Sequence, residues 1–180
     1  ARDKAEIFEG VVPGGAALLN RDDAHFALLQ KRARAAGITK IRGFGEDPRS
    51  DYRLESCELG ATASRITANI AGREIEAEIG VPGRHIVQNV LAVLGAAHLA
   101  GADMDKVAGA LAGLSAERGR GMRHRLKHPK GEFALIDESY NANPASMQAA
   151  IRLLDGAEVE SGGRRIAVLG DMLELGTHSQ

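Results

Sequence analysis

Polar side chains that could bind a small substrate follow two short apolar runs in the second half of the sequence. Asp137 and Glu138 come directly after one run, and Asp171 comes shortly after the other. Carboxylates accept hydrogen bonds from hydroxyl and ammonium groups. In parallel α/β sheets, ligands bind beyond the carboxyl ends of the strands. The two loops, 137–143 and 171–176, therefore predict a site for a nucleotide or another small polar molecule.

A basic segment at 117–130 is the clearest shift in composition along the chain. Two interpretations remain open: a solvated linker, which the composition favours, and a hinge that contacts phosphate or another anion. No aromatic residues interleave with the cations, so stacking on nucleic-acid bases has no support. The cations are Arg118, Arg120, Arg123, Arg125, Lys127 and Lys130.

Several kinds of chemistry have no residue pattern in this sequence. There is no G-x-x-x-x-G-K-[ST] phosphate loop, and no G-x-G-x-x-G run follows a predicted strand. The histidines stand at no metal-ligand spacing. The single cysteine, Cys57, excludes an intramolecular disulfide and is interpreted as a small hydrophobe. A net charge of −1 argues against general nucleic-acid affinity, and no apolar run reaches the roughly 20 residues of a membrane helix.

The first half of the sequence predicts alternating helices and strands, followed by antiparallel strands. Residues 43–80 lack a helical period, and their polar and apolar residues alternate, which is typical of a sheet with one wetted face. A linker at 71–73 suits a hairpin. We predict the end of a helix at 1–8, strands at 16–19, 38–41, 52–59, 63–70 and 73–79, and a helix at 24–36.

The second half predicts helices, then a return to the α/β pattern. We predict a helix at 89–99 and another that Asp103 or Asp105 caps. Strands at 133–136 and 165–169 flank a helix that Asn143 caps with Pro144 at its first position, which predicts a right-handed parallel βαβ unit. We place a domain boundary within 114–121, with domains at 1–116 and 117–180.

Beyond these patterns, particular runs resemble the Mur ligase family. The most specific are L-I-D-E-S-Y-N-A-N-P-A-S-M at 135–147 and I-A-V-L-G-D-M-L-E-L-G at 166–176. Residues 1–15 and the G-R-H-I-V-Q-N run at 83–89 are also similar, although Ile86 replaces the first asparagine of the family pattern. The resemblance covers the whole chain, is weakest over 43–80, and is strongest to members that add D-alanyl-D-alanine.

The resemblance implies a fold and a fragment. We expect an α/β chain: the back part of a Mur ligase central ATPase domain, with a small antiparallel sheet, and then the start of a Rossmann-like C-terminal domain. The chain lacks a methionine at position 1 and a phosphate loop. We therefore expect a central piece of a longer ligase, inactive by itself.

The implied reaction joins D-alanyl-D-alanine to UDP-N-acetylmuramoyl-tripeptide through an acyl phosphate, with ATP and Mg²⁺, in cytoplasmic peptidoglycan synthesis. We expect a monomer, with no nucleic-acid or membrane partner. Three alternatives remain: another amide ligase of the superfamily, of the folylpolyglutamate or cyanophycin type; a non-catalytic nucleotide-binding module; and a nucleic-acid binder that uses the basic segment.

The resemblance also implies roles for individual residues. Lys4 matches the family lysine that becomes carbamylated and binds Mg²⁺, whereas its type alone favours an ordinary surface lysine. Asn89 matches the asparagine that hydrogen-bonds adenine. Arg123, or second Arg120, would reach the nucleotide, and Glu138, with Asp137 one residue away, would contact the ribose. The dipeptide side of the cleft would be lined by residues that turn and cap chemistry explains equally well: Asn141, Asn143, Ser146, Asp171 and Glu174.

Overall fold

The computed structural model describes residues 3–129, 131–159 and 162–172 of the chain. The chain forms two compact units, unit 1 at residues 1–113 and unit 2 at residues 114–180. The division lies close to the predicted boundary between residues 116 and 117. Each unit is described by itself.

Unit 1 contains one mixed sheet of five strands, ordered as they follow one another in the chain. β1 pairs with β2 and β2 with β3 in parallel, whereas β3, β4 and β5 pair antiparallel. The predicted antiparallel strands thus continue the parallel strands in the same sheet. The strands are β1 (Ala16–Asn20), β2 (Lys40–Gly45), β3 (Tyr52–Leu59), β4 (Ser64–Ile70) and β5 (Arg73–Ile79).

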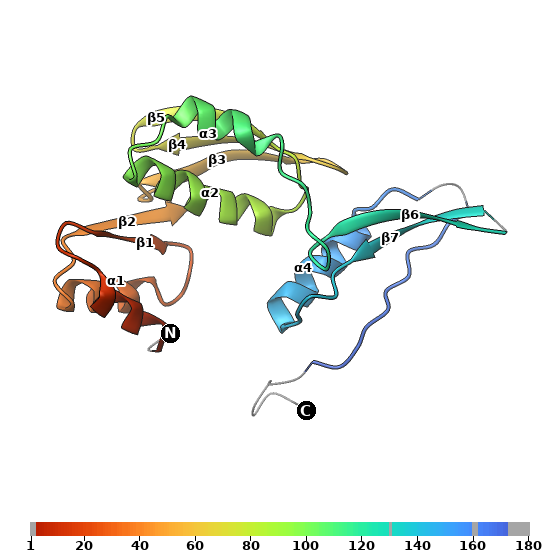
Figure 1. Ribbon diagram of the computed structural model, residues 1–180, viewed down its shortest axis with the longest axis horizontal. Coiled ribbons are helices and arrows are strands. Elements are labelled where there is room, and N and C mark those ends of the chain that lie inside the picture. Colours follow the sequence, from red (N-terminus) through yellow and green to blue (C-terminus); the bar gives the residue numbers. More distant parts are fainter. Residues whose placement is uncertain (1–2, 130, 160–161, 173–180) are drawn as a thin grey trace. The chain divides into compact units, whose positions relative to one another are not determined.

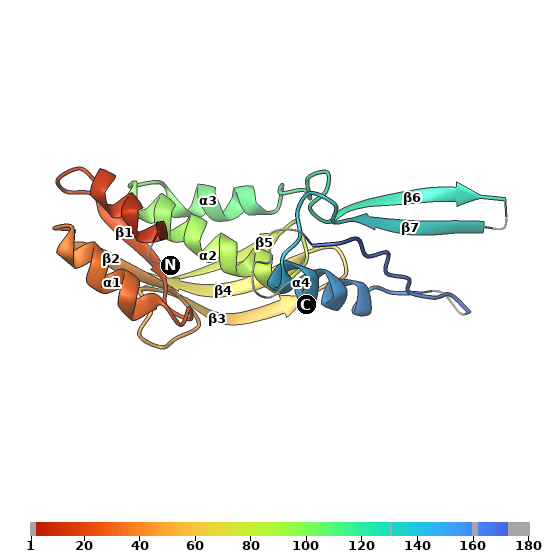
Figure 2. The same ribbon diagram turned by 90° about the horizontal axis from the view of Figure 1, so that it is seen from below.

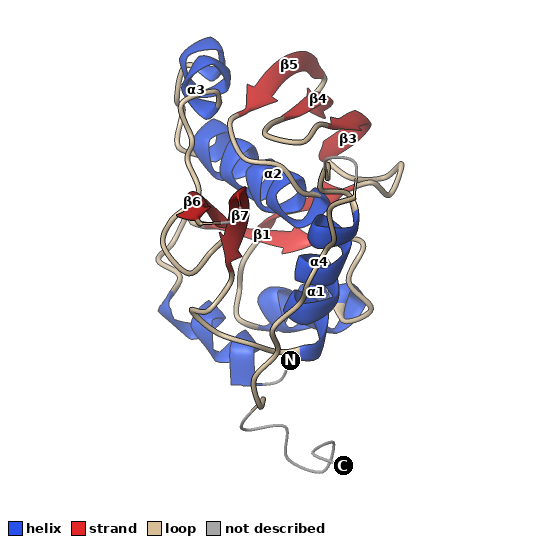
Figure 3. Ribbon diagram, turned by 90° about the vertical axis from the view of Figure 1, so that its right-hand side faces the viewer, coloured by secondary structure: helices blue, strands red, loops and turns tan. Residues whose placement is uncertain are grey.

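Helices pack on both faces of the parallel part of this sheet. Successive residues of a strand point to opposite faces. Ala17 and Leu19 of β1 therefore pack in a cluster with residues of the 3-10 helix η1 (Asp3–Gly10) and of α1 (Phe26–Ala35). Leu18 packs instead against the cluster that contains α2 (Arg84–Leu99), and Figure 3 shows β1 between α1 and α2.

The antiparallel part of the sheet has one covered face and one exposed face. Figure 1 shows α2 and α3 (Met104–Leu111) along the same face of β3, β4 and β5. The alternating residues Ile66, Ala68 and Ile70 of β4 are buried under these helices, whereas the residues between them reach the other face. Burying one such aliphatic side chain contributes about 1.5–3 kcal/mol. This explains why alternation alone predicted these strands.

The hairpin between β4 and β5 turns through two residues with positive φ. Ala71 has φ 54° and Gly72 has φ 93°, as expected for the two-residue turn that matches strand twist. The Asn69 side chain stabilises this turn, because the Gly72 N–H donates to Asn69 Oδ1 at 2.8 Å. The predicted hairpin is confirmed, with an alanine in a conformation that usually favours glycine.

Unit 2 contains a second, two-stranded sheet and one helix. β6 (Met122–His128) and β7 (Gly131–Asp137) pair antiparallel, and Figure 2 shows them side by side. α4 (Pro144–Asp155) follows, with Asn143 as its cap as predicted. The interpretation of the basic segment as a linker is wrong over 122–128, because those residues form β6. Their alternation of basic residues with Met122, His124 and Leu126 suits a strand, a pattern that the charges obscured.

The predicted strand at 165–169 is also not formed. Residues 162–172 contain no helix or strand, and Val168 is 93% exposed. β7 pairs with β6, so the predicted parallel βαβ unit is replaced by an antiparallel hairpin followed by a helix. An apolar run shows that a segment can be a strand, but pairing requires a neighbouring strand that lies far away in sequence.

None of the helices in the described part of the chain combines the length and the apolar character needed to cross a membrane.

Candidate functional site

In unit 2, the Asp137 carboxylate at the end of β7 holds two chain segments together. Its Oδ2 accepts a hydrogen bond from the Gly119 N–H at 3.1 Å. Its Oδ1 accepts bonds from the Ser139 hydroxyl at 2.6 Å and the Ser139 N–H at 3.1 Å. The Ser139 hydroxyl, the Ser139 N–H and then the Gly119 N–H stabilise the charged form, so the pKa of Asp137 is lowered. Both Asp137 oxygens are thus engaged within the protein.

The turn before β6 depends on glycine at position 119. Gly119 is buried and has φ 74°. A Cβ atom there would lie 2.9 Å from Tyr140 Cβ and 3.0 Å from Tyr140 N. The Gly119 carbonyl in turn accepts a bond from the Tyr140 N–H at 3.1 Å. Any side chain at this position would separate the turn from the loop that follows β7.

The two arginines proposed to reach a nucleotide differ in their surroundings. The Arg120 guanidinium lies 4.2 Å above the centre of the Tyr140 ring, a cation–π contact. Arg123 lies on β6 opposite Ile136, is exposed, and makes no ion pair within the described residues. Arg120 is therefore held against the Tyr140 ring, whereas no ion pair fixes the position of Arg123 within the described residues.

The pKa of Glu138 is shifted in the opposite direction to that of Asp137. Glu138 is half-buried, and burial, followed by the nearby charge of Asp137, raises the pKa of its carboxyl. No hydrogen bond engages its carboxylate within the described part of the chain. Glu138 is consequently the carboxylate of the pair that could accept hydroxyl groups of a ligand.

Asn143 and Ser146 form a reciprocal cap at the start of α4. Asn143 Oδ1 accepts from the Ser146 N–H at 2.9 Å, and Ser146 Oγ accepts from the Asn143 N–H at 3.0 Å. Ser146 Oγ also donates to the Asn143 carbonyl at 3.0 Å. The Ser146 hydroxyl is fully used by the helix, whereas the Asn143 NH₂ group remains a donor.

Of the remaining predicted residues, Asn141 and Asp171 are exposed. Asn141 Oδ1 accepts a bond from the adjacent Ala142 N–H at 2.8 Å, and its NH₂ group has no partner among the described residues. Asp171 is exposed in the segment after α4. Glu174 lies outside the described residues. Within unit 2, the structure therefore brings Asp137, Glu138 and the cap of α4 onto one continuous loop.

In unit 1, the start of α2 meets the carboxyl end of β2. Arg84 donates to Glu46 at 2.5 Å, and Gln88 Nε2 donates to the same carboxylate at 3.0 Å. The Asp22 carboxylate accepts the N–H groups of Glu46 and Asp47 at 2.8 and 2.9 Å. The carboxyl end of parallel strands is where α/β sheets bind ligands, so this edge is the candidate nucleotide edge.

Asn89 and Lys4 are both exposed residues of unit 1. Asn89 follows Gln88 in the second turn of α2, because the helix starts at Arg84, earlier than the predicted start at 89. Lys4 lies on η1, where Ala5 and Phe8 provide the buried contacts. Asn89 thus belongs to the helix that reaches the candidate nucleotide edge.

A metal site is not contained in the described part of the chain. Across residues 3–129, 131–159 and 162–172, no three side chains of the His, Cys, Asp or Glu type come together as a metal would require. Lys4 as a carbamate would supply only one such ligand. The residues present therefore do not by themselves fit a magnesium ion.

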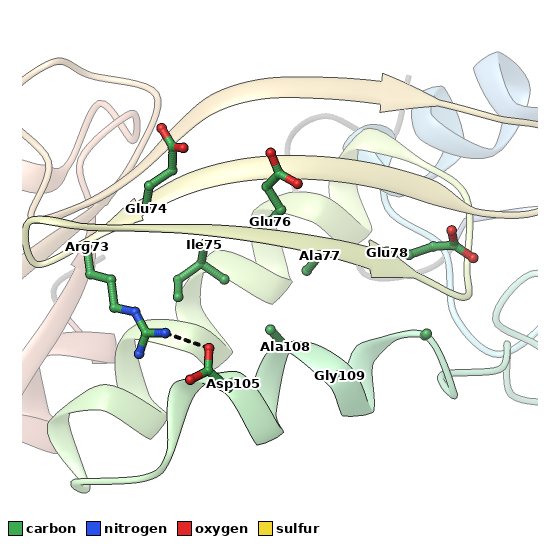
Figure 4. A pocket seen from close by; sticks show the side chains of 10 residues that line it. Arg73, Glu74, Ile75, Glu76, Ala77, Glu78, Asp105, Ala108 and Gly109 are labelled. Carbon is green, nitrogen blue, oxygen red and sulfur yellow. Dashed lines mark hydrogen bonds and ion pairs between the residues drawn. The ribbon is translucent and has the colours of Figure 1, made fainter.

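A shallow pocket between β5 and α3 holds none of the predicted residues. In Figure 4, Arg73 points to Asp105, to which it donates at 2.5 Å, whereas Glu74 and Glu76 point away from the helix. Its remaining lining combines Glu78 with small or apolar residues such as Ile75, and its one arginine is already paired with Asp105. The other charged side chains of this pocket are carboxylates, which would repel the phosphates of a nucleotide.

Comparison with known proteins places this geometry in a family. The model of the Mur ligase middle domain matches residues 1–97, more than half of the chain. The chain belongs to the Mur ligase family. The crystal structure of MurF from Acinetobacter baumannii superimposes on 87% of this Mur ligase chain with a TM-score of 0.78 and 27% identity, and the match covers 33% of that protein.

Curated relatives also match nearly the full chain. The UDP-N-acetylmuramoyl-tripeptide–D-alanyl-D-alanine ligase of Escherichia coli (strain K12) is 32% identical over 181 residues, which cover 100% of this chain and 38% of the relative. The UDP-N-acetylmuramate–L-alanine ligase of Mycolicibacterium gilvum (strain PYR-GCK) is 34% identical over 91% of this chain and 33% of its own length. The chain thus spans about a third of the length of these Mur ligases.

Some contacts at the candidate nucleotide edge and next to the hairpin of unit 2 were not predicted from the sequence. The Glu46 contacts join residues 38 and 42 positions apart in this Mur ligase chain, so no local pattern reveals them. Arg84 and Gln88 stand four residues apart on one helix face, a weak signal of a shared partner. The contact between Arg120 and Tyr140 likewise depends on the fold of the hairpin.

Proposed function

We propose that the intact protein is an ATP-dependent ligase that joins D-alanyl-D-alanine to UDP-N-acetylmuramoyl-tripeptide through an acyl phosphate, and that it acts as a monomer in cytoplasmic peptidoglycan synthesis. The observation that carries the proposal is the β7–α4 loop. Its D-E-S-Y-N-A-N-P-A-S-M run, at 137–147, lies in a Mur ligase fold at the end of a strand. Neither a nucleic acid nor a membrane is part of the proposal.

For the nucleotide, we assign Asn89 to adenine and Arg123 to phosphate. An amide offers one donor and one acceptor, which suits the edge of adenine. The exposure of Asn89 on α2 supports this role. Arg120 is the second choice, because its guanidinium already contacts the Tyr140 ring.

For the ribose, we assign Glu138 as the contact and Asp137 as the residue that positions it. The Asp137 oxygens are engaged by Gly119 and Ser139, whereas Glu138 retains its acceptors. A carboxylate with two free oxygens can accept both ribose hydroxyls. The neighbouring Asp137 charge also raises the pKa of Glu138, so binding two donors would offset that repulsion.

For the dipeptide, we assign donors to its carboxylate and acceptors to its ammonium group. The Asn141 and Asn143 NH₂ groups and the amino-terminal end of α4 can hold the carboxylate. Ser146 holds Asn143 in place. Asp171 and Glu174 are the proposed acceptors for the ammonium group.

For Lys4, we assign carbamylation in the intact enzyme, where the carbamate oxygens would bind Mg²⁺. The ion would neutralise charge on the transferred phosphoryl group. This assignment depends on the family resemblance, since the described residues do not complete a magnesium site.

The test is a phosphate-release assay on the intact protein with ATP, Mg²⁺ and UDP-N-acetylmuramoyl-tripeptide. We expect phosphate release only when D-alanyl-D-alanine is added. Release that instead requires a folate and glutamate would overturn the proposal in favour of a folylpolyglutamate-type ligase. Nucleotide binding without turnover of any acceptor would favour the non-catalytic module.

A second candidate has one specific observation in its favour. The match to a UDP-N-acetylmuramate–L-alanine ligase covers 91% of the chain. The same assay distinguishes this candidate, which would release phosphate with UDP-N-acetylmuramate and L-alanine and would ignore D-alanyl-D-alanine.

A further inference from the structure

A second cavity of unit 1 lies at the other end of α2 from the candidate nucleotide edge. Its volume is about 600 Å³, and it is lined from β2, from the segment before β3, from the β4–β5 turn and from the end of α2. Asn89 and His98 are nine residues apart on α2, about 14 Å along the helix axis. The side chains used below are Lys40, Arg42, Asp51, Tyr52, Asn69 and His98.

The hydrogen-bond acceptors of this cavity are largely occupied by the protein. Asp51 Oδ2 accepts from the Gly43 N–H at 2.8 Å, and Asp51 Oδ1 accepts from Arg42 at 3.3 Å. Asn69 Oδ1 accepts from the Gly72 N–H at 2.8 Å. A ligand that brings donors would therefore find few free partners here.

The donors of the same cavity are largely unused. Lys40 is exposed and has no ion pair within the described residues. Arg42 donates one of its N–H groups to Asp51. The Asn69 NH₂ group has no partner in the described part of the chain. The positive charges exceed the single carboxylate, because Lys40 and Arg42 face only Asp51.

The buried side of the cavity adds two further polar groups. The Tyr52 side chain is fully buried, and its hydroxyl lies 3.2 Å from His98 Nδ1. When the tyrosine donates this bond, the Nε2 of the neutral histidine carries the proton and is a donor. The Ser50 hydroxyl is buried without a partner among the described residues.

We propose that this cavity binds a small oxyanion, a phosphoryl or carboxylate group, between Lys40, Arg42 and the Asn69 amide. An oxyanion brings only hydrogen-bond acceptors, so it can pair with the unused donors of Lys40, Arg42 and Asn69. The positive charges of Lys40 and Arg42 would compensate its negative charge. The site is separate from the proposed ligase residues and does not depend on the proposed ligase activity.

The test is a titration of the chain with inorganic phosphate at constant ionic strength, followed by two-dimensional amide NMR. We expect the amide chemical shifts of Gly72 and Leu99 to change with phosphate concentration and to reach saturation. K40Q removes a cation, and N69D keeps the acceptor for Gly72 but replaces the donor by a negative charge. Each should weaken binding by at least about tenfold, the loss expected for a charged hydrogen bond.

The control is K31Q, which removes an exposed lysine of α1 outside the cavity. We expect its affinity for phosphate to stay within about twofold of the unsubstituted chain. Equal weakening by K31Q and K40Q, or chemical-shift changes without saturation, would overturn the proposal. A parallel titration with acetate separates the sources, since the tighter anion identifies a phosphoryl or a carboxylate ligand.

Discussion

At the scale of single residues, close packing decides what a glycine does. Gly95 of α2 faces the Tyr52 ring, and a Cβ there would lie 2.6 Å from Tyr52 Cδ2 and 3.2 Å from Leu18 Cδ2. Gly109 of α3 is exposed, and a Cβ there would meet nothing within 4 Å. Two glycines with the same local helix propensity therefore have opposite roles.

We expect Gly95→Ala to lower the free energy of unfolding by about 1–3 kcal/mol, because the fully buried Tyr52 ring must move. The matched control, Gly109→Ala, should raise it by up to about 1 kcal/mol, the helix-propensity gain. Urea denaturation of both variants measures the difference. Equal stabilisation by the two substitutions would contradict the close contact at Gly95.

The neighbouring carboxyl groups of Asp137 and Glu138 also differ, in the direction of their pKa shifts. Hydrogen bonds lower the pKa of Asp137, so the stabilisation that they provide is present above its ordinary pKa and is lost as the pH falls through the lowered value. Burial and the Asp137 charge raise the pKa of Glu138. We expect NMR titration of the carboxyl carbons to give Asp137 a midpoint below its ordinary value and Glu138 a midpoint above.

Asp137→Asn separates the two causes of the raised pKa of Glu138, which are its burial and the charge of Asp137. The substitution removes the neighbouring charge but leaves Glu138 half-buried, so its midpoint should fall and still remain above the ordinary value. An unchanged Glu138 midpoint in this variant would exclude the contribution of Asp137.

At the scale of elements, α4 shows how a helix start is set by short-range bonds. Asn143→Ala removes the acceptor for the Ser146 N–H and should destabilise α4 by about 1 kcal/mol. Asn141→Ala is the control, because Asn141 lies outside the helix and its side chain accepts a bond from the adjacent Ala142 N–H rather than from the helix. Cα chemical shifts over Pro144–Asp155 measure the loss of helix. A larger loss from the control would show that the loop, rather than the cap, holds the helix.

Elements that depend on long-range pairing were predicted less well. The α4 cap, the β4–β5 hairpin and β7 follow from nearby residues and were predicted correctly. The basic segment hid β6, and the apolar run at 165–169 suggested a strand that has no partner in the described residues. Strand pairing depends on register with a distant segment, which the pattern within one strand does not contain.

At the scale of the whole molecule, the two units differ in how much apolar surface they bury. Within the described residues, all buried apolar side chains lie in unit 1. In unit 2, the apolar side chains of Phe133 and Leu135 are 50% and 45% exposed. Hydrophobic burial is the dominant favourable term in folding, so unit 1 holds most of the stability of this chain.

We expect the amides of β6, β7 and α4 to exchange with deuterium at least about 100-fold faster than those of β4 and α2, because local opening of unit 2 exposes little additional apolar surface. Mass spectrometry of the exchanged chain measures this ratio. Equal protection in the two units would mean that unit 2 has stability that its buried surface does not explain.

The sequence by itself determined the family resemblance of this chain and the local start and end of several elements. The run at 137–147 carries the family resemblance, and caps, turns and alternation involve residues only a few positions apart. Tertiary structure alone decided which polar groups remain available. Gly119 and Ser139 occupy the Asp137 carboxylate, whereas the Glu138 carboxylate accepts no hydrogen bond within the described residues. Strands 40–45 and 64–70 meet the end of α2 around a cavity rich in donors. The reason is physical: a hydrogen-bonding group is used or free according to its neighbours in space, and those neighbours are set by packing between distant segments.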